Sequence, residues 1–243
     1  MNGTIYLEIV SFFLFFSLVF YTSLHLLAKH WKSFRTLNSK VQIQFVSRIV
    51  SSVHSVLVFL ISVYILLTDE KISQKIIYSS PIIIANSCIV IAYFLNDLMM
   101  ILWYRELFDI QFLLHHIVAL ISSIFSMKYD VFFYFVLMRL LSEGSTLFIN
   151  IRWFLLSLSM KESKVYTING LLVFIVFGLV RIVPIIPFWK KFYEYSNNPD
   201  WQLVQYFLII ICAANAVILD SLNIYWYSRI VSIVYKSLKQ KKN

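Results

Sequence analysis

The sequence has few of the residues that form turns, loops and disulfide bonds in soluble domains. Its 243 residues include only 4 glycines, 4 prolines and 2 cysteines. This scarcity excludes glycine-rich phosphate loops, collagen repeats and disordered linkers. Cys88 and Cys212 lie inside apolar runs without a Cys or His neighbour at metal-ligand spacing. They predict buried thiols rather than a disulfide framework or a structural zinc site.

Charge is scarce as well. The chain has 21 basic and 12 acidic residues, which is 14% of its length, whereas 60% of its residues are hydrophobic. Soluble domains contain about 25% charged and 45–50% apolar residues. The excess apolar surface must therefore face something other than water, which excludes a soluble globular domain.

Apolar runs long enough to cross a bilayer, about 20 residues each, recur from end to end. The sequence predicts seven spans, at residues 6–28, 45–67, 82–103, 110–126, 131–158, 165–188 and 201–227. Their connections are too short for an extramembrane domain. The predicted fold class is all-α, a multi-pass membrane protein with about seven transmembrane helices.

Basic residues are unequally divided between the loops on the two sides. The loops 29–44, 104–109 and 159–164 and the tail from 228 hold 12 Lys and Arg residues, and the opposite loops hold 5. The positive-inside rule then predicts a cytoplasmic C-terminus and an N-terminus in the lumen or outside. The net charge of +9 belongs mainly to these loops and the tail. It predicts no nucleic-acid partner.

The C-terminal tail carries Lys239 and Lys241, the fifth and third residues from the end. This spacing resembles the dilysine signal that returns membrane proteins to the endoplasmic reticulum. A basic anchor against anionic lipid explains the same lysines.

Ionisable residues lie inside the predicted spans, where each costs roughly 2.5–3.5 kcal/mol at the helix centre on insertion scales. They are Arg48, His54, Asp97, His115, His116, Arg139, Glu143, Arg152, Arg181 and Asp220. Five of them lie about five to eight residues inside the predicted cytoplasmic ends, or roughly 8–12 Å deep, as does Asn150, and Arg48 is slightly shallower. The five are Asp97, His115, His116, Arg152 and Asp220. This shared depth predicts a polar pocket open to the cytoplasm, and Arg181, nearer the lumenal half, is not explained by it. The alternative is a set of salt bridges and hydrogen bonds that only holds the bundle together.

Two spans carry these polar residues in stripes at helical spacing, which are expected to face inward. The stripes are Asn86, Tyr93, Asp97 and Tyr104 in one span, and Arg139, Glu143, Thr146 and Asn150 in the other. Arg139 and Glu143 are also spaced to pair along their own helix.

His115 and His116 are the candidate catalytic residues, together with Asp97 on the preceding span. Adjacent histidines on a helix point about 100° apart, so one can meet a substrate while a carboxylate orients the other. The alternative is a pair of histidines that hydrogen-bond between helices. The chain has five histidines, and this pair lacks the i, i+3 or i, i+4 spacing of a helical chelate, so no metal site is predicted.

In these residues the sequence resembles the TLC-domain family, which joins ceramide synthases, translocating-chain-associating membrane proteins and a ceroid-lipofuscinosis cargo receptor. The resemblance runs from about residue 36 to the last span. It is carried by Ser47–Ser51 with His54, Ala85–Asn86 through Asn96–Leu98, Phe112 through His116, Arg139 through Trp153, Ile168–Gly170 with Val180–Ile182, and Leu219–Asp220 with Asn223. One departure is Leu147, where related sequences carry proline, which predicts a straighter fifth span.

The resemblance implies a six-helix TLC barrel formed by the second to seventh spans. The chain then divides into an N-terminal helix and basic turn (1–35), a TLC domain (36–230) and a basic cytoplasmic tail (231–243). It also implies residence in the endoplasmic reticulum membrane and a part in lipid synthesis, lipid balance or cargo handling.

In ceramide synthases the paired histidines are catalytic, and a His-Asp-x-Ser-Asp signature follows them. In this sequence the His and Asp of that signature fall on Ser142 and Glu143, and its Ser and final Asp fall on Ser145 and Thr146. Transfer of an acyl chain to a sphingoid base is therefore not expected.

The leading hypothesis is a protein of lipid homeostasis that binds or processes a membrane lipid or acyl chain in the pocket. Its polar layer would comprise Arg48, His54, Asn86, Glu143, Asn150, Arg152 and Asp220. One alternative is an acyltransferase that uses His115 and His116, with acyl-CoA as co-substrate and no other cofactor. A second is a non-catalytic cargo escort, and a further copy of the chain stays open as a partner.

Overall fold

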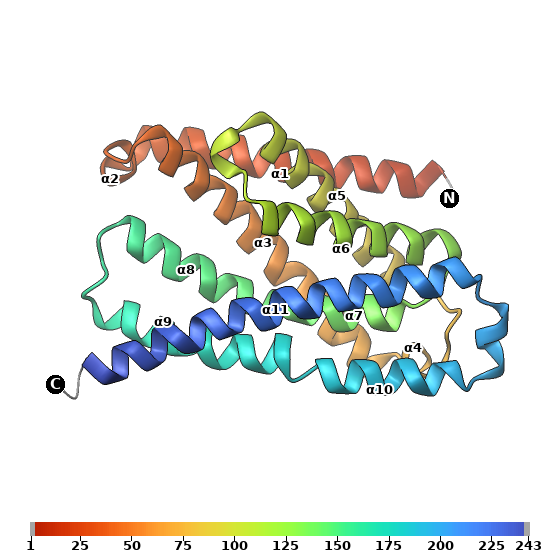
Figure 1. Cartoon of the computed structure of the whole chain (residues 1–243). Helices are drawn as coiled ribbons and strands as arrows, with labels where there is room; N and C mark the ends of the chain where they lie inside the picture. Colours follow the sequence, from red (N-terminus) through yellow and green to blue (C-terminus); the bar gives the residue numbers. More distant parts are fainter. Residues whose placement is uncertain (1–2, 241–243) are drawn as a thin grey trace.

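The structure, a computed structural model, describes residues 3–240, and their regular structure is helical apart from one isolated bridge between Ile77 and Val131. The α-helices of this part are α1 (Gly3–His30), α2 (Lys32–Arg35), α3 (Ser39–Thr68), α4 (Lys71–Gln74), α5 (Pro81–Trp103), α6 (Ile110–Tyr129), α7 (Phe133–Leu140), α8 (Thr146–Ser157), α9 (Lys164–Phe177), α10 (Ile185–Ser196) and α11 (Tyr206–Gln240). Figure 1 shows the long helices running side by side, with the two ends of the chain at opposite ends of the bundle.

Several helices begin at residues suited to that position. The side chains of Asn38 and Asp109 accept hydrogen bonds from backbone amides in the first turns of α3 and α6, and Pro81 is the first residue of α5. Asn38 and Asp109 thus accept hydrogen bonds from amide groups that have no partner inside the helix, and Pro81 has no amide hydrogen that needs one.

Six helical segments of the described chain are long and apolar enough to cross a membrane. They are Gly3–His30, Ser39–Thr68, Pro81–Trp103, Ile110–Tyr129, Lys164–Ser196 and Tyr206–Ser237. Large apolar side chains on these segments are exposed, for example Leu7, Leu18 and Ile186 at 68%, 62% and 78%. An outer surface of this kind suits lipid rather than water. The predicted class, an all-α multi-pass membrane protein, is confirmed.

The predicted span at 131–158 is divided rather than continuous. A 3₁₀ turn at Leu141–Ser145 separates α7 from α8, so neither part is long enough to cross a membrane as one helix. The straighter helix expected from Leu147 is therefore wrong. A Cβ at Gly144, in this turn, would lie 2.7 Å from the Phe59 ring of α3, so the glycine permits this close approach. In Figure 1, α7 and α8 occupy opposite halves of the bundle, and the segment still traverses it.

Two other predicted boundaries are wrong. Helical structure continues past 188 because a π turn at Gly178–Ile182, just before Pro184, joins α9 to α10. In this turn Val183 N donates to Gly178 O at 3.0 Å, a hydrogen bond that spans five residues instead of four. The wider turn lies just before Pro184, which has no amide hydrogen to donate. The last helix extends to Gln240 instead of ending at 227. Lys239 therefore lies in the last turn of α11, and Lys241 lies outside the described residues.

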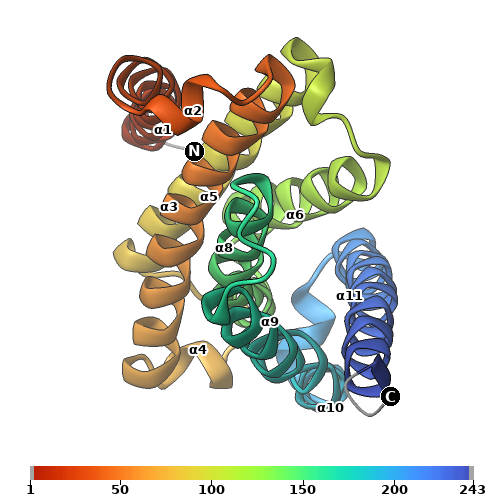
Figure 2. The ribbon, with the colours of Figure 1, turned by 90° about the vertical axis from the view of Figure 1, so that its left-hand side faces the viewer.

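Six elements form a closed ring, in which each one contacts the next: α3, α5, α6, α11, α9 and α8, which returns to α3. Figure 2 looks at this arrangement from one end, with α1 outside the ring beside α3 and α5. Asn96 Nδ2 of α5 donates to Ser17 Oγ of α1 at 2.6 Å, a hydrogen bond that joins α1 to the ring. The division into residues 1–35, 36–230 and 231–243 stays a prediction.

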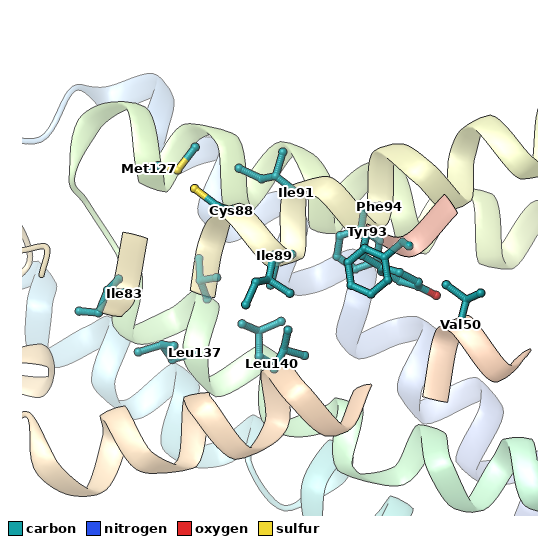
Figure 3. Close-up of a cluster of buried hydrophobic side chains, with 14 of the residues drawn as sticks. Val50, Ile83, Cys88, Ile89, Ile91, Tyr93, Phe94, Met127, Leu137 and Leu140 are labelled. Atoms are coloured by element: carbon teal, nitrogen blue, oxygen red, sulfur yellow. The ribbon is translucent and has the colours of Figure 1, made fainter. Parts of the chain in front are cut away.

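The principal hydrophobic core surrounds α5. In its most apolar stretch 61% of the α5 residues are buried, compared with 11% for α1. Figure 3 shows Leu137 and Leu140 of α7 next to Ile89 of α5, and Cys88 beside Met127 of α6. Both cysteines are free thiols. Tyr93 and Phe94 belong to this core and also line the polar part of the ring interior.

Candidate functional site

A cavity of about 1080 Å³ occupies the ring interior, and all six elements of the ring contribute to its wall. It reaches the end of the bundle formed by the loops at 106–109 and 161–162 and by Ser237 of α11. We call this end, which also contains the end of α11, the C-terminal end (Figure 1). Small-molecule sites commonly have volumes of about 300–1,000 Å³, so the space is large enough for a headgroup as well as a chain.

His115, His116 and Asp97 all line this cavity. Asp97 Oδ2 lies 2.8 Å from His116 Nδ1, and each side chain is 13% exposed. The His116–Asp97 contact is within ion-pair distance but is not aligned as a hydrogen bond. The rings of the two histidines are 5.5 Å apart, and His115 Nδ1 is buried without any polar partner among the described residues. Asp97 thus contacts one histidine of the pair and leaves the other unpaired.

Arg48 and Asn150 join α3 to α8 at the cavity wall. Arg48 Nη1 donates to Asn150 Oδ1 at 3.0 Å, and Asn150 Nδ2 donates in return to Ser52 Oγ at 3.0 Å. The Arg48 guanidinium also lies 4.7 Å from the centre of the Trp153 ring. These contacts are all with neutral groups, and they hold the cation in one position.

Arg152 occupies a notch between α8 and α9. Its guanidinium lies 4.0 Å from the centre of the Tyr166 ring, and Nη1 donates to Tyr166 O at 3.3 Å. A Cβ at Gly170 would lie only 2.5 Å from Nη1, so glycine at this position leaves space for the guanidinium.

Arg181, for which the sequence offered no explanation, also lines the cavity. Its guanidinium donates to Ser145 Oγ at 2.8 Å, to Thr146 Oγ1 at 3.2 Å and to Asn223 Oδ1 at 3.2 Å. Thr146 Oγ1 donates in turn to Glu143 Oε2 at 2.9 Å. Thr146 therefore connects the buried cation to the Glu143 carboxylate.

Three residues of the predicted polar layer do not line the cavity: His54, Asn86 and Asp220. The His54 ring stacks on Tyr93 at 3.7 Å, and Asn86 Nδ2 donates to Ser62 Oγ at 3.1 Å. Both are buried contacts within the bundle.

The sequence wrongly predicted Asp220 to lie in the polar layer, because its depth was counted from a predicted helix end at residue 227. The helix extends to Gln240, which puts Asp220 twenty residues, or roughly 30 Å, from that end. Asp220 pairs with Arg139 and accepts a hydrogen bond from Trp189 Nε1 at 2.8 Å. Arg139 therefore does not pair with Glu143 along its own helix.

A second, smaller cavity of about 70 Å³ lies next to the first. It shares Phe94, His115 and Glu143 with the main cavity, and most of its wall is apolar. His115 therefore lies where the polar interior meets a narrower apolar space. Within residues 3–240 no three His, Cys, Asp or Glu side chains are grouped so that they could hold a metal ion.

Sequence reasoning also missed several residues of the cavity wall, including Lys161, Tyr166, Trp226 and Arg229. Trp226 Nε1 of α11 donates to Gln111 Oε1 of α6 at 2.7 Å and so helps to close the ring. Lys161 and Arg229 lay in predicted loop and tail segments, where basic residues give no signal of a site.

Comparisons with known proteins agree with this architecture. The model of the TLC domain matches residues 44–232. The chain is 35% identical to human TLC domain-containing protein 4 over 91% of this chain and 85% of that protein. It is 31% identical to zebrafish TLC domain-containing protein 4-B over 80% of this chain and 75% of that protein. No solved structure gives a significant match. The chain belongs to the TLC-domain family.

Proposed function

We propose that this protein binds a lipid or acyl chain inside its helical ring and contributes to membrane lipid homeostasis. The observation that carries the proposal is the cavity of about 1080 Å³, with charged and polar side chains toward the C-terminal end. A large apolar pocket with a few convergent polar groups is the usual form of a small-molecule site. The adjoining apolar space beyond His115 suits the distal part of a chain.

The proposed location is the endoplasmic reticulum membrane, with the C-terminus and the cavity mouth in the cytoplasm. The distribution of Lys and Arg among the loops supports this orientation. The family resemblance and the lysines of the tail support the compartment. A ligand would then enter from the cytoplasmic leaflet or the cytosol.

Filling the cavity tests the proposal. Ile149 of α8 lines the cavity, whereas Ile168 of α9 is 60% exposed on the outside. We expect Ile149→Trp to lose co-purifying lipid and to fail to restore the lipid profile of cells that lack the protein. Ile168→Trp, the matched control, should behave like the wild type. An unchanged acyl-chain and headgroup profile in cells without the protein would contradict the proposal.

An acyltransferase is the second candidate, and the unpaired His115 beside the His116–Asp97 contact favours it. As general base, a histidine would take a proton from the acceptor, which would attack the thioester carbonyl while the C–S bond breaks and CoA leaves as a thiol. Purified protein mixed with long-chain acyl-CoA should then release free thiol. His115→Ala/His116→Ala should abolish the release.

The double substitution His25→Ala/His30→Ala is the control, because both residues are exposed on α1 outside the cavity. If the wild type releases no thiol, or if the His115/His116 variant releases as much as this control, the acyltransferase hypothesis fails. The lipid-binding proposal is unaffected by either result.

A further inference from the structure

Four arginines line the cavity without a carboxylate partner. Arg229 has no hydrogen bond or aromatic contact within residues 3–240, whereas the other three, Arg48, Arg152 and Arg181, are held by such contacts. The ion pairs found within residues 3–240 are His116–Asp97, Arg139–Asp220 and Lys191–Glu194. Arg48, Arg152 and Arg181 take part in none of them. A cation within a membrane span is costly unless it is paired or solvated, so each of these side chains needs a counter-charge or water.

Arg181 is the least available of the three for a ligand. It is 6% exposed, and all three of its guanidinium nitrogens donate to neighbouring oxygens. Thr146 further connects it to Glu143. Its hydrogen-bonding capacity is therefore largely used inside the protein.

Arg48 and Arg152 have free donors. Each uses Nη1 for one hydrogen bond within residues 3–240, and neither Nε nor Nη2 of either side chain has a partner there. These four nitrogens are also not among the enclosed, unpartnered atoms of the described chain. They are therefore accessible rather than enclosed, and both residues line the open cavity.

Both guanidinium groups are held in position before any ligand binds. Arg48 is fixed by Asn150 and Trp153, and Arg152 by Tyr166 and the space at Gly170. A preorganised guanidinium loses little conformational entropy on binding and presents a planar pair of donors that matches phosphate oxygens. Two such groups on either side of α8 suit a headgroup with several anionic oxygens better than one carboxylate.

The acidic residues of the cavity do not satisfy these donors. Asp97 contacts His116, Glu143 accepts from Thr146, and Asp109 accepts from amides at the start of α6. Neither Glu106 nor Glu162 at the mouth lies within ion-pair distance of an arginine in the described chain. We infer that the amphiphile bound in this cavity carries a phosphate group, which Arg48 and Arg152 bind. This inference rests on the proposed lipid-binding function.

The test compares two lipids that differ only in the phosphate. Purified full-length protein is incubated with dioleoyl phosphatidic acid or with dioleoylglycerol, and bound lipid is measured by native mass spectrometry. We expect the wild type to bind the phosphatidic acid about tenfold more tightly, because hydrogen bonds to charged groups contribute about 1.5–3 kcal/mol. Arg48→Gln and Arg152→Gln should each reduce this preference and leave dioleoylglycerol binding unchanged.

Two further variants distinguish specific recognition of the phosphate from general electrostatic attraction to basic residues. Arg105→Gln removes one exposed basic residue outside the cavity at the same end and should keep the preference. Gly170→Ala retains both arginines but displaces the Arg152 guanidinium, so it should reduce the preference without a change in net charge. Because Arg48 and Arg152 are tested separately, the failure of one variant to fold leaves the other informative.

A third ligand, palmitoyl-CoA, distinguishes the sources of the phosphate. Competition by palmitoyl-CoA that requires Arg48 or Arg152 would assign the contacts to a CoA thioester, and its absence would assign them to a phospholipid headgroup. Equal binding of the two dioleoyl lipids, or a preference that survives both arginine substitutions, would overturn the inference alone. Competition by free palmitate as strong as that by palmitoyl-CoA would also overturn the inference of a phosphate group. Failure of every ligand to bind would overturn the proposed lipid-binding function as well.

Discussion

Gly144 packs directly against the Phe59 ring of α3. An added Cβ would lie 2.7 and 2.9 Å from two carbons of the Phe59 ring, which is closer than such contacts allow. We expect Gly144→Ala to lower the free energy of unfolding by about 1–3 kcal/mol, as overpacked substitutions do. Gly3→Ala, where no atom lies within 4 Å of the added Cβ, is the control and should be neutral or slightly stabilising. Reversible unfolding in mixed micelles measures both, and equal stabilities would contradict the prediction.

The Arg139–Asp220 pair provides a second prediction for single residues. The Arg139 and Asp220 side chains are 19% and 9% exposed, so Asp220→Ala leaves a cation largely removed from solvent without its partner. We expect a loss of about 3–5 kcal/mol in stability. Glu194→Gln, which breaks the more exposed Lys191–Glu194 pair, should cost less than about 1 kcal/mol. Similar losses for the two variants would show that Asp220 contributes no more than a surface charge.

Sequence reasoning identified some cavity residues but not their partners. Arg48, Asp97 and His116 were found because a polar side chain in an apolar run must face the bundle interior. Similar depth on neighbouring helices predicted that Asp97 orients one histidine of the pair, without specifying His116. The pairing of Arg139 with Asp220 could not be predicted, because it depends on where α11 ends.

At the scale of elements, α1 packs outside the ring, and Asn96 of α5 donates hydrogen bonds to two of its oxygens, Ser17 Oγ and, at 3.4 Å, Phe13 O. Ser17 Oγ accepts a hydrogen bond from Asn96 Nδ2 at 2.6 Å, whereas Ser11 Oγ donates only to a carbonyl of its own helix. We expect Ser17→Ala to reduce stability by about 0.6 kcal/mol and by no more than about 1.7 kcal/mol, the average and the maximum measured for interhelical hydrogen bonds in a membrane protein. Ser11→Ala should have no effect. Equal effects in an unfolding titration would mean that apolar packing alone holds α1.

Helix ends were the least predictable feature of the elements. Hydropathy finds apolar runs, but it does not detect the 3₁₀ turn at Leu141–Ser145, which depends on the contact of Gly144 with α3. The helical extension of α11 beyond 227 is more polar than a membrane span, so composition assigned it to a tail. Such boundary errors change the predicted depth of a residue by about 1.5 Å for each position miscounted.

The whole molecule is a ring whose interior is packed at one end and open at the other. The packed part around α5 contains Ile83, Cys88 and Ile89, and the open part begins beyond Tyr93 and Phe94. The all-α, multi-pass class and the apolar exterior were predictable from the sequence alone, whereas six segments rather than the predicted seven are long and apolar enough to cross a membrane. A closed barrel of the second to seventh spans was implied only by the family resemblance. The order of neighbouring helices was not predicted, because hydropathy does not specify which helices are in contact.

The orientation of the ring in the membrane determines whether its cavity opens toward the cytoplasm. The loops and tail predicted to be cytoplasmic hold 12 basic residues against 5 in the opposite loops, and the start of α1 and the end of α11 lie at opposite ends of the bundle (Figure 1). We expect a glycosylation tag added before Met1 to be glycosylated and the same tag added after Asn243 to stay unmodified. Replacing Lys29, Lys32 and Arg35 with glutamine should weaken this difference, because short basic loops determine orientation. Glycosylation at the C-terminal tag of the wild type would instead place the cavity mouth, with Arg48 and Arg152, toward the lumen, and would exclude a cytosolic CoA thioester as the ligand.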